Sequence, residues 1–330
     1  MLPDIEVIAV VSNPMQYQSR YALYQAFAED LQQQEVSVRL WTVELSHGMR
    51  PPVVTQADNE NHIQLWTSAL PGEIWYKENL INYAINYLSL VVPDWRYVAW
   101  VDADFKFEPD AFSKTIQALQ HYDVVQMWSH LINLSPTGGI INQQVGISFM
   151  YGLLKAGLVP TGEYPCWLGS PGGAWAARRE SLNKIGSALG SPLIDWTILG
   201  SGDTYFASCL NGLMGTNVGT SSQLVSNWSQ YSPAYRNSIL QFQTIAVAEL
   251  KKNIGYVENT VRHMFHGRQK DKQYGTRDEI LIKYQFDPFT DLKSDVSGVL
   301  QLVVSSERQI FLRDACRQYF RSRNEDVNSL

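Results

Sequence analysis

A nearly unbroken apolar run, Ile5 to Val11, lies near the start of the chain and constrains its fold more than any other feature. A run without alternating polar residues is typical of a strand that is buried on both faces of a sheet. Ser12-Asn13-Pro14 breaks this run, and apolar residues then recur at helical spacing from Arg20 to Leu31. Val36 to Leu45 returns to a strand pattern. This order predicts a parallel nucleotide-binding sheet with its ligand at the carboxyl ends of the strands.

The same reasoning predicts further elements along the chain. They are a helix over Ile74 to Val92, a strand over Tyr97 to Val101, a helix over Phe112 to Leu119, a strand over His121 to Trp128, a strand end after Gly173, a helix over Arg178 to Ile185, a helix and then a strand within Ile239 to Val257, and a last helix over Glu307 to Arg321. Residues 130–170 are rich in Gly, Pro, Asn and Ser, and we expect irregular structure over the active site there.

Composition and charge exclude several classes of protein. The chain is 45% hydrophobic and 18% charged, which is typical of a globular protein and not of a disordered one. Its net charge of -6 argues against a protein that coats nucleic acid without specificity. Three scattered cysteines, Cys166, Cys209 and Cys316, are too few for a disulfide framework or a thiolate metal site. We find no run of about 18 apolar residues and no signal-peptide pattern, and we therefore expect a cytoplasmic protein without a membrane span.

Two carboxylates, Asp102 and Asp104, follow the strand predicted at Tyr97 to Val101. If the chain turns there, one carboxylate can reach a ribose or a metal-bound water while the other binds a divalent cation. Mg²⁺ and Mn²⁺ bind carboxylate oxygens together with substrate phosphate oxygens, and the metal then neutralises charge on a leaving diphosphate. Asp-x-Asp alone is a weak pattern, because it is common in solvated turns. Its position after an apolar strand favours a metal and nucleotide-diphosphate site.

Three further segments offer groups that could bind phosphate or sugar. Lys77 and Asn79 open a predicted helix, where the helix dipole favours anionic oxygens, although an ordinary exposed first turn has the same pattern. Gly172 and Gly173 allow the backbone to approach a ligand closely. Trp175 could stack on a sugar face or fill the core.

Asp203 lies in a glycine-flanked loop before a predicted helix. A carboxylate there could take the proton from an acceptor hydroxyl, or it could cap the helix, and the two roles are compatible. His263 and His266 are three residues apart and could share one face, so that one of them becomes a further metal ligand. A basic and polar segment follows them and could close over a diphosphate. It contains Arg268, Lys270, Lys272, Tyr274 and Arg277.

The order of these motifs resembles that of the GT-A glycosyltransferases, and more closely that of a group of glycosyltransferase-like proteins frequent in bacteriophage and bacterial genomes. The resemblance covers roughly residues 4–293. It rests on Ser12-Asn13-Pro14, Ser19-Arg20-Tyr21, Trp75-Tyr76-Lys77-Glu78-Asn79, Trp100-Val101-Asp102-Ala103-Asp104, Gln126-Met127-Trp128-Ser129, His266-Gly267-Arg268 and Phe286-Asp287-Pro288. The sequence departs from the expected pattern at Gly202-Asp203-Thr204, where a bulkier polar run is expected.

The resemblance implies a GT-A fold, which is α/β with a mixed, mainly parallel sheet flanked by helices, here with a C-terminal helical extension. We expect a catalytic domain over residues 1–260, with a donor half over about 1–125 and an acceptor half over about 126–260. Residues 261–330 would then form a C-terminal segment with a His/basic loop and a terminal helix.

The resemblance also implies a metal-dependent glycosyltransferase that uses a nucleotide-diphosphate sugar, usually a uridine diphosphate sugar, with Mn²⁺ or Mg²⁺. The implied roles are metal binding by Asp104 with His263 or His266, contact of Asp102 with the ribose or the metal and its waters, and proton abstraction by Asp203. Donor contacts are expected from Asn13, Lys77, Asn79, Asp102, Gly172, Gly173, Trp175, Arg268, Lys270 and Tyr274.

The acceptor stays open at this point. One hypothesis is a hydroxymethylated pyrimidine in phage DNA, flipped into an aromatic pocket, in which case the host cytoplasm would be the location. Basic residues that could contact DNA phosphates, or form a solvated helix face, are Lys270, Lys272, Arg277, Arg313, Arg317, Arg321 and Arg323. A glycan, protein or small-molecule acceptor is the alternative.

Two other classes of protein compete with a glycosyltransferase. A sugar nucleotidyltransferase would need a glycine-rich basic loop after the first strand, and Ser12-Asn13-Pro14-Met15 offers none. A non-catalytic nucleotide-sugar-binding protein gains little from so many desolvated charges.

Overall fold

The computed structural model describes residues 3–68, 72–141, 145–155, 166–216, 218–219 and 227–327. Its centre is a seven-stranded sheet in the order β12-β6-β10-β4-β1-β2-β3. Every neighbouring pair is parallel except those that β10 makes with β4 and β6. The strands are β1 (Ile5–Ser12), β2 (Val38–His47), β3 (His62–Thr67), β4 (Tyr97–Val101), β6 (Val124–Gln126), β10 (Ala174–Arg178) and β12 (Ile254–Tyr256). The predicted mixed, mainly parallel sheet is confirmed.

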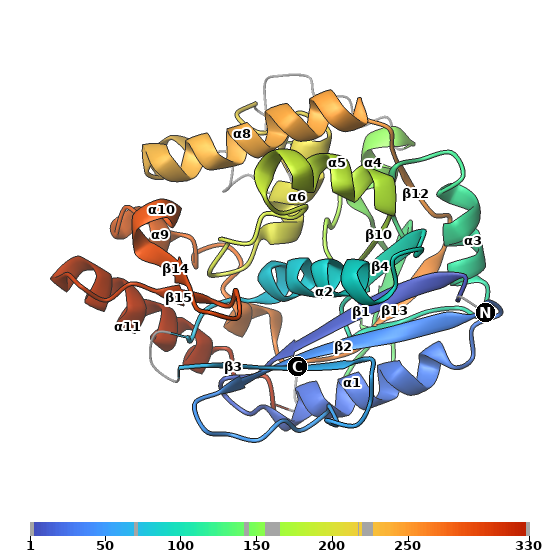
Figure 1. Ribbon diagram of the computed structural model, residues 1–330, viewed down its shortest axis with the longest axis horizontal. Coiled ribbons are helices and arrows are strands. Elements are labelled where there is room, and N and C mark those ends of the chain that lie inside the picture. The colour runs from blue at the N-terminus through green and yellow to red at the C-terminus, as the bar shows by residue number, and fades with distance from the viewer. Residues whose placement is uncertain are drawn as a thin grey trace.

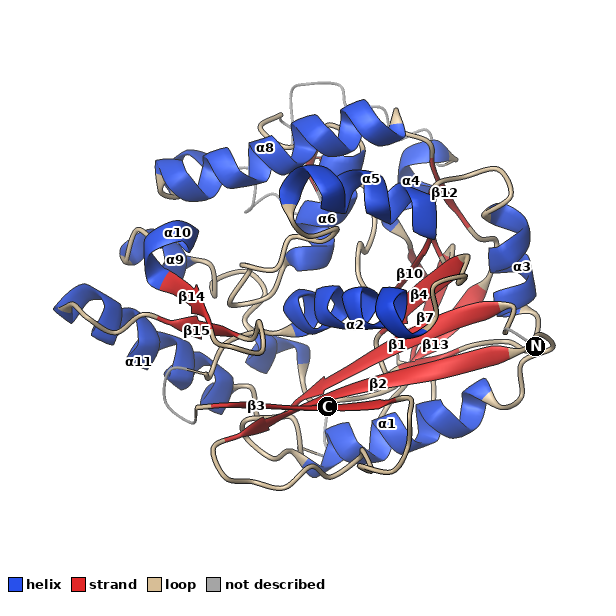
Figure 2. Cartoon of the chain, viewed as in Figure 1, coloured by secondary structure: helices blue, strands red, loops and turns tan. Residues whose placement is uncertain are grey.

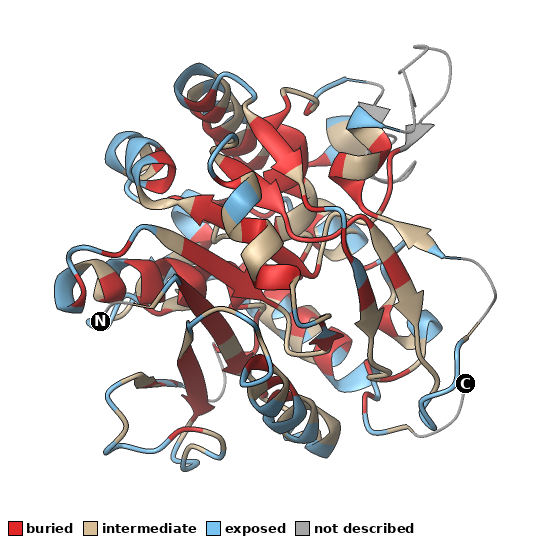
Figure 3. Ribbon diagram, turned by 90° about the vertical axis from the view of Figure 1, so that its right-hand side faces the viewer, coloured by how far each residue is buried: buried red, intermediate tan, exposed pale blue. Residues whose placement is uncertain are grey.

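Helices cover both faces of this sheet (Figure 1). One face packs against α2 (Lys77–Val91) and against the layer of α5 (Arg179–Leu189), α6 (Gly202–Leu210) and α8 (Pro233–Leu250). The other face packs against α1 (Gln18–Leu31) and α3 (Ala111–Ala118). β1 serves both cores, because Ile8 joins the first while its neighbours Val7 and Ala9 join the second. This double burial explains why β1 is apolar almost throughout, and Figure 3 shows the central strands as buried.

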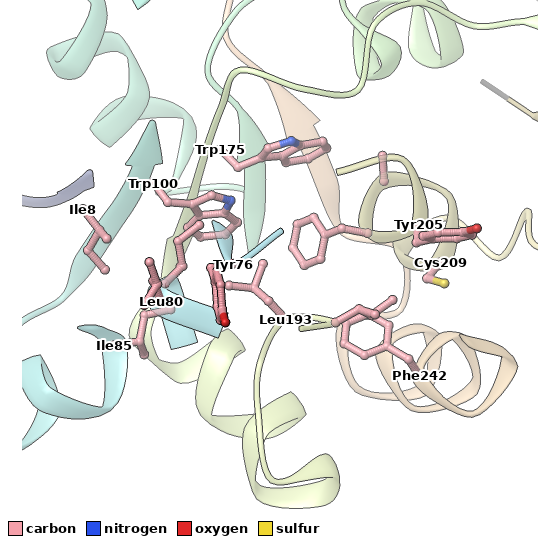
Figure 4. Close-up of a cluster of buried hydrophobic side chains, with 14 of the residues drawn as sticks. Ile8, Tyr76, Leu80, Ile85, Trp100, Trp175, Leu193, Tyr205, Cys209 and Phe242 are labelled. Atoms are coloured by element: carbon pink, nitrogen blue, oxygen red, sulfur yellow. The ribbon is translucent and has the colours of Figure 1, made fainter. Parts of the chain in front are cut away.

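The larger core is aromatic. Trp100 of β4 and Trp175 of β10 are fully buried and contact the ring of Phe206 edge-on, with centroids 5.6 and 5.4 Å apart. Phe242 of α8 extends the cluster, and Tyr76 joins it from the residue before α2 (Figure 4). Edge-on ring pairs of this kind stabilise a core beyond the area that they bury.

A second, four-stranded sheet lies beside the first, in the order β5-β13-β7-β8. Its strands are β5 (Phe105–Lys106), β13 (Thr260–His263), β7 (His130–Asn133) and β8 (Gly146–Ile147). The expectation of irregular structure over 130–170 is therefore wrong for much of that range, which also contains α4 (Phe149–Leu154) and β9 (Cys166–Trp167). β9 pairs with β11 (Val218–Gly219). Residues 142–144 and 156–165 lie outside the described part of the chain.

Several predicted boundaries shift. The helix expected from Ile74 begins only at Lys77, since Trp75 N donates instead to Ile198 O at 2.8 Å. The strand expected over His121 to Trp128 is confined to β6, because residues 119–121 form a turn after α3. The helix and strand expected between Ile239 and Val257 are confirmed as α8 and β12.

The C-terminal part forms a separate layer on one side of Figure 2. A short 3₁₀ helix, η1 (Trp228–Gln230), precedes α8 and lies outside this layer. The layer itself contains η2 (Gln269–Lys272), α9 (Glu279–Lys283), α10 (Pro288–Asp291), β14 (Leu292–Ser294), β15 (Leu300–Leu302) and α11 (Glu307–Ser322). α11 confirms the predicted last helix, and Ser306 with Gln309 forms a capping box at its start. The predicted boundary at residue 260 coincides with the first residue of β13, and the division into domains stays a prediction. Among the described residues, we find no helix long and apolar enough to span a membrane.

Candidate active site

The site lies where the order of the parallel strands changes direction. β1 has β2 on one side and β4 on the other, and ligands of open α/β sheets bind beside the carboxyl ends of strands at such a point. Asn13 follows β1 and Asp102 follows β4. Both line a cleft of about 1550 Å³. Sites for single drug-sized ligands measure roughly 300–1,000 Å³, so this cleft has room for two substrates.

The turn after β4 separates the two carboxylates of the Asp-x-Asp motif. Asp102 N donates to Gly173 O at 2.7 Å, and Phe105 N donates to Asp102 O at 3.1 Å, which closes the turn. β5 then pairs with β13, so that His263 lies opposite Phe105. Met264 N donates to Asp104 O at 2.7 Å. This long-range pairing brings the two histidines to Asp104.

Asp104, His263 and His266 direct their side chains toward one point. Asp104 Oδ2 lies 3.0 Å from His266 Nε2 and 3.7 Å from His263 Nε2, and the two Nε2 atoms are 3.1 Å apart. Ligand atoms about 2.1 Å from a tetrahedral or octahedral ion stand about 3–3.4 Å from one another. The triad therefore has dimensions that suit a divalent cation.

The surroundings of the triad also suit a cation. His263 Nδ1 lies 2.9 Å from Asn133 Oδ1, which fixes the ring with the proton on Nδ1 and leaves Nε2 for a metal. Burial lowers the pKa of His266 to about 4, so its ring is neutral near pH 7. Asp104 Oδ1 is buried and has no hydrogen-bond partner. Lys272 Nζ lies 2.8 Å from His266 Nε2, and this amine must move away when a cation uses that nitrogen.

Asp102 belongs to a second cluster, with Lys77 and Asp203. Lys77 Nζ lies 2.6 Å from Asp102 Oδ1 and 2.8 Å from Asp203 Oδ2. Burial alone would lower the pKa of Lys77, but the two carboxylates raise it above its ordinary value, so the amine stays charged. Lys77 therefore holds the carboxylate after β4 and the carboxylate at the start of α6 in fixed positions.

The loop that carries Asp203 is strained and held from several sides. Gly200 and Ser201 both have positive φ, 94° and 72°, which is unfavourable for serine. Arg277 Nη2 donates to Ser201 Oγ at 2.7 Å. Asp203 lies in the first turn of α6, and its carboxylate contacts Lys77 and does not cap the helix, whose N-cap is Ser201. The alternative that Asp203 is an N-cap is therefore wrong.

Glu78 packs against the same loop. Its side chain is 4% exposed, and its Oε1 has no hydrogen-bond partner. A Cβ added at Gly202 would stand 2.8 Å from Glu78 Cγ and closer still to the carboxylate. Burial, with Asp203 nearby, raises the pKa of Glu78 to about 8. Gly202 is thus required by the carboxyl group that lies beside it.

A set of cations lines the side of the cleft nearest the C-terminal layer. Its members are Arg20, Arg268, Lys272, Arg277 and Arg323. Glu325, whose side chain is buried, pairs with Arg20 and with Arg323, the latter at 2.6 Å. Burial alone would raise the pKa of Glu325, but these two arginines lower it. Arg268 pairs with Asp271 at 2.9 Å.

Most of the residues predicted for this site do line the cleft. They are Asn13, Lys77, Asp102, Asp104, Gly172, Gly173, Asp203, His263, His266, Arg268 and Tyr274. Gly172 faces the base candidate, since an added Cβ would stand 3.3 Å from Asp203 Oδ2. Gly173 has a φ of 98° and lies against the ring of Phe105, which accounts for glycine there.

Two predicted donor contacts are corrected, those of Trp175 and Asn79. Trp175 fills the core with no exposed surface, and its Nε1 donates to Pro171 O at 2.8 Å, so it cannot stack on a sugar. Asn79 is buried, and its side-chain amide is used within the protein. Its Nδ2 donates to Gly298 O at 3.2 Å, and its Oδ1 accepts from Leu300 N at 3.2 Å. Lys270 is exposed and does not line the cleft, and its donor contact stays a prediction. Trp and Asn side chains suit both a ligand contact and a place in the core, and only the tertiary packing decides between these two roles.

The basic residues suggested for DNA contact are mostly engaged inside the protein. Lys272, Arg277 and Arg323 are buried. Arg313 pairs with Asp314 at 2.7 Å, and Arg317 pairs with Glu73 at 2.9 Å. Only Lys270 and Arg321 of that predicted set are exposed.

Sequence reasoning missed three residues of the site. Glu78 and Arg20 belong to motifs of the resemblance, but no role was assigned to them. Nothing in the sequence around Glu78 indicates that its carboxyl group is buried. Asn133 lies in a segment predicted to be irregular, where pairing with β13 cannot be foreseen.

Comparison with known proteins gives weak matches. No family model matches the chain, and no curated protein matches it. Among solved structures, S. aureus TarS in complex with UDP-GlcNAc is 12% identical over 74% of this chain and 67% of that chain, with a TM-score of 0.37. A mutant of Drosophila beta-1,4-galactosyltransferase 7 in complex with manganese, UDP-Gal and xylobiose is 11% identical over 66% and 68%, with a TM-score of 0.32. At this level of similarity the matches establish neither the family nor the activity of this chain.

Proposed function

We propose that this protein is a metal-dependent glycosyltransferase that transfers a sugar from a nucleotide-diphosphate sugar to an acceptor hydroxyl. The observation that carries the proposal is the convergence of Asp104, His263 and His266 beside the carboxyl ends of β1 and β4. The switch point of an open α/β sheet favours a nucleotide there. The cations on one side of the cleft favour a diphosphate.

The roles of the chain's own groups follow from their positions. A divalent cation bound by the triad would supply positive charge that neutralises a leaving diphosphate. Arg20, Lys272 and Arg323 can hold the phosphate oxygens, because all three line the same side of the cleft. Asp102 lies apart from the triad, so we assign it to the donor's ribose or to waters and not to direct metal ligation.

Asp203 is our candidate for the general base. The acceptor oxygen bonds to the anomeric carbon while the bond from that carbon to the diphosphate oxygen breaks. The hydroxyl proton passes to Asp203, and the nucleoside diphosphate leaves. Lys77 contacts Asp203 at 2.8 Å and orients its carboxylate in the free protein. A carboxylate that is already held by a charged amine is well placed to accept a proton once the substrates displace part of that contact.

Metal-dependent binding of the donor nucleotide tests this proposal first. We expect UDP to bind in the presence of Mn²⁺ in isothermal titration, and to bind at least about tenfold more weakly in Asp104→Asn and His266→Gln. His121→Gln, at an exposed position after α3, is the matched control and should bind as the wild type does. Absence of metal-dependent binding with every nucleoside diphosphate tested would sink the proposal.

Transfer is then measured with a panel of nucleotide sugars, as release of nucleoside diphosphate. Asp203→Asn should keep donor affinity while the rate falls by about a hundredfold or more. If Asp203→Asn retains the wild-type rate, another group is the base.

The acceptor is the finer part of the proposal. A hydroxymethylated base in DNA would require cations that reach phosphates outside the cleft, and few of the predicted ones are exposed. A small-molecule acceptor therefore takes precedence over DNA in the proposal.

A further inference from the structure

One wall of the cleft carries apolar side chains. We define the apolar wall as Leu131, Leu134, Ile141, Val145 and Ile147, all of which line the cleft. Within the described residues from Trp128 to Ile147 that line the cleft, no side chain is charged. The charged lining residues come instead from the strand ends, α1, α2, α6 and the C-terminal layer. The cleft is thus divided into a charged part and an apolar part.

Part of the apolar wall lies on the face of the small sheet that carries the metal triad. Leu131 and Asn133 are alternate residues of β7 and so point to the same side. Asn133 contacts His263, so this side faces the triad. β8 pairs with β7, with Leu131 opposite Gly146 and His130 opposite Ile147, so Gly146 shares the face of Leu131 and Ile147 belongs to the alternate face. Val145 and Ile147, on either side of Gly146, line the cleft at the edge of the sheet that β8 forms.

The wall also begins next to the candidate base. Ser170 N donates to Ile147 O at 2.9 Å. From Ser170 the chain runs through Pro171 to Gly172, which faces Asp203. A group that lies on the wall can therefore present a hydroxyl to Asp203. The metal triad and the cations of the cleft would hold the donor's phosphates, so we assign the apolar wall to the acceptor.

The chemistry of the wall selects the acceptor class. Apolar side chains offer no hydrogen bonds to a phosphate or to a sugar ring with many hydroxyls, and desolvating such groups there would be costly. Burying methylene or aromatic carbon is favourable. Val145 is 51% exposed, so a ligand would gain by covering it. We propose that the acceptor carries its reactive hydroxyl on an alkyl or aromatic group that lies along the apolar wall. This inference rests on the proposed glycosyltransferase function.

The simplest probes are straight-chain alcohols. We would load the protein with UDP and Mg²⁺, verify that UDP is bound, and measure the affinities of ethanol, butanol, hexanol and octanol by saturation-transfer NMR. Each fully buried methylene should tighten binding by about fourfold, and partial burial still predicts about tenfold or more from butanol to octanol. Benzyl alcohol distinguishes an aromatic acceptor from an alkyl one. A site for an aromatic group binds benzyl alcohol more tightly than hexanol, and a site for an alkyl group binds it more weakly than hexanol.

A pair of exposed positions in the same hairpin provides the matched variants. Val145→Asp places a charge on the wall and should abolish the dependence on chain length. Ile140→Asp places the same charge at a residue that is 67% exposed and outside the cleft lining, and should leave the dependence unchanged. Neither side chain is buried, so both variants should fold.

The outcomes separate this inference from the function on which it rests. If UDP does not bind with metal, the proposed function fails, and the acceptor inference that rests on it fails with it. If UDP binds but octanol binds no more tightly than butanol, the acceptor inference alone is overturned. Equal loss in both aspartate variants would also overturn it, because the effect would then come from net charge.

Discussion

The contact between Gly202 and Glu78 predicts a substitution whose effect changes sign with its background. Gly202 is the first residue of α6 and has an ordinary helical conformation, so alanine is acceptable to the backbone. The three atoms nearest to an added Cβ all belong to Glu78, the farthest of them at 2.8 Å. Carbon atoms pack favourably at about 3.5–4 Å, so the Glu78 side chain must move by about 1 Å or more.

We therefore expect Gly202→Ala to lower the free energy of unfolding by about 1–3 kcal/mol, which is the usual cost of overpacking. In the Glu78→Ala background the clashing atoms are gone. There, the same Gly202→Ala change should raise the free energy of unfolding by about 0.4–1 kcal/mol, because alanine restricts the unfolded chain and favours the helix.

The assay is a double-mutant cycle by guanidinium denaturation of the wild type, Gly202→Ala, Glu78→Ala and the double variant. The unfolding free energies are compared with one common slope against denaturant concentration. The predicted interaction free energy is about 1.5–4 kcal/mol, from the two ranges above. A cost of Gly202→Ala that is the same in both backgrounds would refute the reasoning, since it would show that Glu78 does not occupy this space. Circular dichroism of each variant controls for a wider loss of structure.

Two further predictions concern stability. In the folded protein the pKa of Glu78 is about 8, whereas the unfolded chain releases this proton near 4.5. The free energy of unfolding should therefore fall between about pH 4.5 and pH 8, by up to about 1.4 kcal/mol per pH unit. This fall should be absent in Glu78→Gln, and the same dependence of unfolding free energy on pH in both proteins would contradict the assignment. Asp326 accepts hydrogen bonds from the N–H groups of Gln18 and Ser19 at 3.0 and 2.9 Å. Asp326→Ala should therefore lower the free energy of unfolding by about 1 kcal/mol, and Asp326→Asn by less. Identical denaturation midpoints for the wild type and Asp326→Ala would show that this contact contributes nothing.

The parts of the fold that follow from local pattern could be predicted. β1, α1, β4 and α11 each have a periodicity or an apolar run that competing structures do not share, and all four were predicted within a few residues. The start of α2 was misplaced because Ile74 and Tyr76 are as apolar as the helix that follows. Their burial comes from the core and from the bond between Trp75 and Ile198, neither of which leaves a local signal.

The small sheet could not be predicted for a related reason. β5 and β8 have two residues each, which is too short to show a period of two. Their strand character comes entirely from partners that are distant in sequence. The pairing of β5 with β13 is nevertheless what brings His263 to Asp104. The histidines could therefore be named as candidates from their spacing, while the geometry that joins them to the carboxylate depends on a tertiary contact.

The Asp-x-Asp motif shows most clearly where sequence reasoning ends. The turn expected there does separate its carboxylates and leaves Asp104 in the triad, but the contact of Asp102 with Lys77 could not be foreseen. Lys77 contacts Asp102 and Asp203 together, so one buried amine neutralises two carboxylates from different elements. The two halves of the proposed reaction are therefore held by different elements, the metal half by the small sheet and the base half by α2 and α6. The two halves meet at the turn after β4, so a change in that turn should affect both donor binding and proton transfer.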